Sequence, residues 1–231
     1  MNRILKVALT LTILFSLAAL CAAAEDTAED TNKTGKHEIE PEEYVVYSAL
    51  INATYAKYIP GYPRPQQHIK MIVINEHTSQ RVSDMEEIGK EAGNDILADY
   101  KAKNSQSYQL QNLFKLDVNC VLICKEELKE IFIYEGPGRP QECQKKPDKE
   151  FGERPNPDNC MEAEWEKFYD KFPNSQGIMS LSRVGFNQDG TEALVYVEDW
   201  CGWLCGEGNY VLLSKENGQW VIRKKMGVFV S

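Results

Sequence analysis

The fold is decided by the last 54 residues of the chain, 178–231, which read IMSLSRVGFNQDGTEALVYVEDWCGWLCGEGNYVLLSKENGQWVIRKKMGVFVS. Four runs rich in β-branched and aromatic residues follow one another there, at 178–186, 192–198, 210–214 and 220–230. The segments NQDG at 187–190 and ENG at 216–218 have the composition of hairpin turns, in which glycine tolerates a positive φ. This stretch therefore predicts an antiparallel meander.

Helical patterns dominate upstream of this block. Apolar residues recur at helical spacing after Pro41 and again before Pro173, and a capping-box pattern at 83–86 opens another helical segment, which Gly93 interrupts. A short helix is predicted at 126–132, and strands are predicted at 68–74 and within 110–124. We therefore expect an α+β fold in which helices pack on one face of a C-terminal antiparallel sheet that disulfides stiffen.

The first 24 residues have the pattern of an export signal. Arg3 and Lys6 precede an uncharged apolar run at 7–20 that is too short to span a bilayer, and AAA at 22–24 is a small-residue cleavage pattern. The sequence predicts a signal peptide at 1–24, a disordered acidic leader at 25–40, and a single domain at 41–231 with a proline-rich insertion at about 135–160. The mature protein is then periplasmic or secreted and has no integral membrane segment. In the alternative interpretation, a lipid on Cys21 anchors it to a membrane.

Export decides how the cysteines are interpreted, because disulfides persist outside the cytoplasm. Cleavage after Ala24 leaves an even set of disulfide candidates, Cys120, Cys124, Cys143, Cys160, Cys201 and Cys205. Cys143 and Cys160 bracket the proline-rich insertion, and Cys201 and Cys205 could close a small ring. Cys120 and Cys124 would be about 13 Å apart on one strand, too far to bond each other, but could join in a helix or loop.

Composition narrows the classes of partner. The chain has 35 acidic and 26 basic residues, for a formal net charge of −9. Nucleic acids and anionic membranes bind through clustered lysine and arginine, so this balance disfavours both as partners. Only three histidines and no CxxC pair are present, and no nucleotide-binding motif occurs, so neither a metal site nor a cofactor is predicted.

The densest group of unusual residues is DWCGWLCGEG at 199–208. Trp200 and Trp203 are large, rigid side chains of the kind that anchor ligands and partner proteins, and Glu207 adds a charge beside them. The predicted ligand-binding residues are therefore Trp200, Trp203 and Glu207, on a loop between two hairpins. The purely structural alternative is a disulfide ring that stiffens the connection between strands.

The sequence evidence for catalytic residues is weaker than that for ligand-binding residues. Glu198, Asp199 and Glu207 could supply the paired carboxyl groups of an exported hydrolase. No nucleophile motif, phosphate-binding loop or zinc-binding motif accompanies them, and acidic residues are common on solvated surfaces. The sequence thus favours a non-catalytic module that binds a protein or a small molecule.

Several segments of the C-terminal block resemble a family of uncharacterised exported bacterial proteins: SRVGFN at 182–187, ALVYV at 193–197, GNYVLL at 208–213 and KENGQW at 215–220. The resemblance extends more loosely over 44–231 and implies a shared fold, with no activity to transfer. The last hairpin is also similar to the closing strands of nuclear-transport-factor-like cone folds, which often hold small ligands between helices and a curved sheet.

Overall fold

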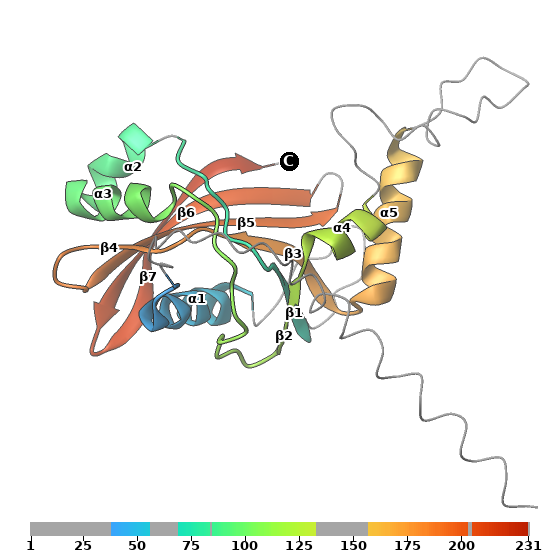
Figure 1. The fold of residues 1–231 in the computed structure, drawn as a ribbon, viewed down its shortest axis with the longest axis horizontal. Coiled ribbons are helices and arrows are strands. Elements are labelled where there is room, and N and C mark those ends of the chain that lie inside the picture. The colour runs from blue at the N-terminus through green and yellow to red at the C-terminus, as the bar shows by residue number, and fades with distance from the viewer. Residues whose placement is uncertain (1–37, 56–68, 84, 133–156, 203–204, 231) are drawn as a thin grey trace, which may run out of the picture. The chain divides into compact units, whose positions relative to one another are not determined.

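The computed structural model describes residues 38–55, 69–83, 85–132, 157–202 and 205–230. The predicted signal peptide, most of the acidic leader and nearly all of the proline-rich insertion lie outside these ranges. The described residues form helices and one mixed sheet (Figure 1), so the α+β class is confirmed.

The helices and strands follow the predicted order closely. The helices are α1 (Pro41–Thr54), α2 (Met85–Ala92), α3 (Asn94–Lys103), α4 (Lys125–Ile131) and α5 (Pro157–Lys171). The strands are β1 (Met71–Asn75), β2 (Asn119–Ile123), β3 (Ser175–Leu181), β4 (Gly185–Phe186), β5 (Glu192–Gly202), β6 (Cys205–Glu216) and β7 (Gln219–Val230). Gly93 separates α2 from α3 with a φ of 86°, which confirms the predicted interruption. No helix among the described residues is long and apolar enough to cross a membrane.

The sheet has the strand order β2-β1-β3-β5-β6-β7, and β4 pairs with β5. Strands β3, β5, β6 and β7 are antiparallel neighbours, as the C-terminal block predicts. Strand β1 is parallel to both β2 and β3, so the sheet is mixed and not purely antiparallel. Parallel neighbours need long crossover connections, and the chain places α2 and α3 between β1 and β2, and α4 and α5 between β2 and β3.

Helices cover both faces of the sheet, which corrects the expectation of a single covered face. Helix α1 packs on one face, here called the α1 face, and α2 to α5 pack on the other, here called the α5 face. Figure 1 shows α1 on the opposite side of the strands from α2 and α3. The reason lies in β5, where five consecutive residues from Ala193 to Val197 are buried. Because neighbouring side chains on a strand point to opposite faces, such a run needs cover on both sides.

A buried ion pair fixes α1 to the sheet. Glu43 is fully buried and Arg183 is 2% exposed. The Glu43 carboxylate accepts hydrogen bonds from the Arg183 guanidinium and, at 2.8 Å, from the backbone N–H of Val184. The guanidinium also lies 4.6 Å from the centre of the Tyr108 ring. Buried charges are tolerated when they are paired and hydrogen-bonded, so these contacts define where α1 sits.

Residues 199–202 and 205–208 belong to two strands, in place of the predicted loop. Strand β5 continues to Gly202 and β6 begins at Cys205, so the segment is the end of a hairpin. Asp199 pairs with Glu207, and Trp200 pairs with Gly206. The prediction was wrong because glycine and cysteine weaken an isolated strand, whereas cross-strand pairing here extends both strands past them.

One disulfide joins Cys201 to Cys205 across this hairpin, with their Cα atoms 5.1 Å apart. Cys120 and Cys124 have free thiols, so the structure pairs neither of these two disulfide candidates. Cys120 lies within β2 and Cys124 directly follows that strand, so extended backbone separates them. Burial raises the pKa of the Cys120 thiol to about 11. Cys143 and the side chain of Cys160 lie outside the described residues.

Candidate ligand-binding site

A cavity of about 510 Å³ lies on the α5 face, between the sheet and helices α4 and α5. Its sheet side is lined by Asn75, Ile178, Ser180, Glu198, Trp200 and Gly202. Its helix side is lined by Leu128, Phe132, Glu164 and Trp165. We call it the Trp200 cavity. It combines a mostly aromatic and aliphatic lining with a few polar groups, which is the usual composition of a small-molecule site.

Strand register places the polar groups in one row. Ser180 on β3 is directly opposite Glu198 on β5. On the other side, the Asn75 side-chain amide on β1 donates a hydrogen bond of 2.5 Å to the Ser180 hydroxyl. Ile178 is opposite Trp200, so the next row on the same face is apolar. The sheet thus presents a polar row beside an apolar row to the cavity.

The Glu198 carboxylate is held by two neutral donors. The Trp200 indole N–H donates to one carboxylate oxygen at 2.6 Å, and the Tyr196 hydroxyl donates to the other at 3.1 Å. Both donors are two residues from Glu198 along β5 and so lie on the same face. Burial, together with the negative charge of Glu198, raises the pKa of Tyr196, so the hydroxyl remains protonated and continues to donate. Glu198 forms no ion pair within the described part of the chain.

Trp200 is supported from the far side by β7. Its ring centre lies 5.4 Å from that of Phe229. Gly208, opposite Glu198 on β6, gives Phe229 the space to lie there, because a Cβ at this position would be 2.4 Å from the Phe229 ring. The indole position is therefore determined by packing as well as by its bond to Glu198.

Aromatic side chains also build the helix side of the cavity. Phe132 follows α4 and lies 5.1 Å from Trp165 of α5, centre to centre, in an edge-to-face arrangement. Trp165 in turn packs on Phe168, which is fully buried. The Tyr169 hydroxyl donates to the backbone carbonyl of Cys201 at 3.0 Å, which ties α5 to the hairpin end. The two tryptophans thus stand on independently supported walls.

The structure brings together only part of the predicted site. Trp200 lines the cavity, Trp203 lies outside the described residues, and Glu207 is exposed on the α1 face. The carboxyl groups considered for hydrolysis do not share one cleft, because Glu198 faces the cavity whereas Asp199 and Glu207 are on the opposite face of the sheet.

Sequence reasoning missed several cavity residues. Asn75 and Ser180 are far from Glu198 in the chain and meet it only through strand register. Trp165 belongs to the apolar helical pattern before Pro173, which predicts a packed helix face and not a cavity wall, and Glu164, which is 8% exposed, precedes it in the chain. No sequence pattern marks a carboxyl group on an amphipathic helix as buried, so the sequence does not predict that Glu164 lines the cavity.

A second unusual carboxyl group, Asp199, lies on the α1 face. It is 9% exposed, it accepts a hydrogen bond from the Tyr55 hydroxyl at the end of α1, and its other oxygen is buried without a hydrogen-bond partner among the described residues. Burial raises its pKa to about 7; the Tyr55 bond and Lys225 act in the opposite direction, and Glu207 adds to the rise. Burial and the charge of Asp199 also raise the pKa of Tyr55.

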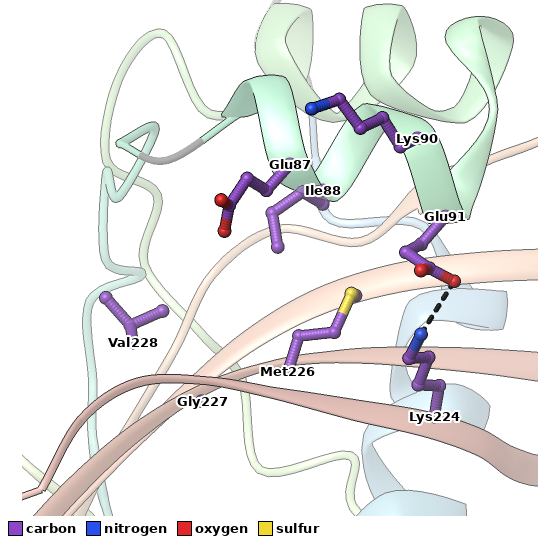
Figure 2. A pocket seen from close by; sticks show the side chains of 8 residues that line it. All are labelled: Glu87, Ile88, Lys90, Glu91, Lys224, Met226, Gly227 and Val228. Carbon is purple, nitrogen blue, oxygen red and sulfur yellow. Dashed lines mark ion pairs between the residues drawn. The ribbon is translucent and has the colours of Figure 1, made fainter.

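A groove of about 450 Å³ lies between α2 and β7 (Figure 2). Glu91 and Lys224 form an ion pair of 2.7 Å across it, and Lys90 points away from the strand. Nearly half of each paired side chain is exposed. This groove lacks the aromatic walls of the Trp200 cavity, and its facing charges neutralise each other, so it is the weaker candidate.

Metal coordination has no basis in the described residues, where no three His, Cys, Asp or Glu side chains gather closely enough to hold an ion. The chain matches no protein-family model, no curated protein and no solved structure. The resemblance to exported bacterial proteins therefore stays a prediction.

Proposed function

We propose that this protein is an exported, non-catalytic binding protein that takes a small molecule with an apolar body into the Trp200 cavity. The observation that carries the proposal is the pair of tryptophans on opposing walls, Trp165 from α5 and Trp200 from β5, around a volume of about 510 Å³. Pockets for small ligands commonly measure about 300 to 1,000 Å³ and combine apolar walls with a few fixed polar groups.

Preorganisation of the site supports a binding role. Phe229 and Glu198 hold Trp200, and Phe132 and Phe168 hold Trp165, before any ligand arrives. Side chains that are already ordered lose little conformational entropy when a ligand binds.

Export is supported by the pattern of the first 24 residues and by the Cys201–Cys205 disulfide beside the cavity. Disulfides persist mainly outside the cytoplasm. The disulfide holds the hairpin end that contributes Trp200 and Gly202 to the lining.

Fluorine NMR of the exported protein labelled with fluorotryptophan tests the proposal, with phenylpropanol and phenylpropylamine as probes. Trp→Phe variants assign the tryptophan resonances. We expect the resonances of Trp165 and Trp200 to shift with probe concentration and that of Trp220 to stay in place, because Trp220 contacts Phe186 and Glu42 elsewhere in the fold.

Two matched substitutions separate binding from folding. Trp200→Phe removes contact area and the donor to Glu198, and we expect about a fivefold to tenfold loss of probe affinity. Trp220→Phe also removes one indole donor, to Glu42, and should leave probe affinity within about twofold of the parent. Equal losses in both variants, or no probe-dependent shift at Trp165 and Trp200, would overturn the proposal.

A further inference from the structure

We infer that the ligand of the Trp200 cavity is an organic cation, an amine or related ammonium group attached to an apolar body. This inference rests on the proposed function and adds the chemical class of the ligand. It follows from three features of the cavity: the negative charge of its ionisable groups, the hydrogen-bond acceptors that line it, and its aromatic walls.

The ionisable side chains that line the cavity in the described part of the chain are both acidic, Glu164 and Glu198. Glu198 is half-buried, and among the described residues it receives hydrogen bonds only from neutral groups, the Trp200 indole and the Tyr196 hydroxyl. Each of its oxygens keeps capacity to accept a further bond. A partly desolvated carboxylate without a counter-ion attracts a cation more strongly than an exposed one, and it repels an anion.

Hydrogen-bond acceptors continue along the polar row. The Asn75 side-chain amide donates one of its two N–H groups to the Ser180 hydroxyl, and its side-chain oxygen is a further acceptor in this row. Neighbouring strands are about 4.8 Å apart, so acceptors on β1, β3 and β5 span about 10 Å. An ammonium group brings three N–H donors and no acceptor, which matches such a row.

The aromatic walls suit the same ligand. The faces of tryptophan rings attract cations through the ring quadrupole, and the effect increases when the cation is partly desolvated. Trp165 and Trp200 can therefore contact both the apolar body and the charged end of one molecule. The polar row faces the charged end of such a ligand, and the neighbouring apolar row, Ile178 with Trp200, faces its apolar body.

Three probes that share a phenyl ring and a propyl chain test the inference in the full exported protein. They are phenylpropylamine, phenylpropanol and phenylpropanoate, which carry a cation, a neutral hydroxyl and an anion. Isothermal titration gives their affinities, and the fluorotryptophan resonances of Trp165 and Trp200 locate the binding. We expect the amine to bind at least tenfold more tightly than the alcohol, and the carboxylate not to bind.

Glu198→Gln is the decisive variant, because glutamine keeps an acceptor for Trp200 and removes the charge. We expect this variant to bind the amine at least tenfold more weakly, within about twofold of its affinity for the alcohol. Glu207→Gln, an identical change on the exposed opposite face, should leave all three affinities unchanged. Circular dichroism and the melting temperature of each variant show that it is folded.

The outcomes distinguish the two proposals. If the alcohol binds as tightly as the amine, or if Glu198→Gln leaves the preference for the amine intact, the inference of a cationic ligand is wrong while the binding function stands. If none of the probes shifts Trp165 or Trp200, the proposed function fails and the inference fails with it.

Discussion

Asp199 offers the most sharply defined perturbation of this protein, its replacement by asparagine. The carboxyl group is 9% exposed, it accepts a hydrogen bond from Tyr55, and its other oxygen is buried with no hydrogen-bond partner in the part of the chain that the structure describes. Asparagine has nearly the same shape, can still accept the Tyr55 hydrogen bond, and stays neutral at every pH. The Asp199→Asn variant therefore removes the ionisation of this group while keeping its shape.

The expected size of the effect follows from the pKa. Burial raises the pKa of Asp199 from its ordinary value of 3.8 to about 7, so between these values the folded protein keeps a proton that the unfolded chain releases. The contribution of Asp199 to the free energy of unfolding therefore falls as the pH rises, by about 1.4 kcal/mol per pH unit from about pH 4 to about pH 7, and is constant above that range. The total, about 4 kcal/mol, is a large part of the roughly 5 to 15 kcal/mol typical of a folded domain.

Urea denaturation of the parent and of Asp199→Asn across this pH range measures the effect. We expect the difference in unfolding free energy to change steadily in favour of the variant up to about pH 7 and to be constant above it. The variant gains less than the full amount at high pH, because its amide N–H groups lie at the unpartnered position, at a cost of about 1 to 3 kcal/mol. Asp189→Asn, at an exposed turn, is the control. Parallel stability curves for parent and Asp199→Asn would refute the reasoning.

Two further substitutions test the packing. Glu43→Leu leaves the guanidinium of Arg183 buried without its counter-charge and should lower the unfolding free energy in urea by about 3 to 5 kcal/mol, whereas adding Arg183→Met should recover at least half of the loss; a double variant no more stable than the single one would contradict this. Gly208→Ala puts a Cβ 2.4 Å from both the Phe229 ring and the Tyr196 hydroxyl oxygen, so we expect a loss of about 1 to 3 kcal/mol and weaker probe binding. An unchanged melting temperature and unchanged affinity would show that the site does not depend on this packing.

Local patterns in the sequence predicted the elements well. Helix α1 begins at Pro41, α2 and α3 are separated at Gly93, and the β6–β7 turn at Asn217 and Gly218 has positive φ at both residues. Each of these depends on neighbouring residues, through helix periodicity, glycine geometry or turn chemistry. The parallel pairing of β1 with β2 and β3 depends on contacts between segments that are far apart in the chain, so no local sequence pattern predicts it.

Part of the candidate site could likewise be predicted from the sequence, and part could not. Trp200 and Glu198 stand out in the sequence by composition, and the Cys201–Cys205 spacing allowed the disulfide that the structure has. The predicted loop was wrong because cross-strand pairing extends β5 and β6 through those residues. Once 199–202 and 205–208 are strand, alternation sends Glu198 to the face opposite Asp199 and Glu207, so the three carboxyl groups do not meet in one cleft.

The sequence by itself determined the α+β class, most helix and strand positions and the hairpin order of the C-terminal strands, because these follow from the period of apolar residues and the needs of turns. Only the tertiary structure decided that helices cover both faces, that Asn75 and Ser180 stand in line with Glu198, and that Trp165 faces the same cavity as Trp200. Those relations are set by strand register and by the packing of segments far apart in the chain. A one-residue change of register would turn each of these strand side chains to the other face.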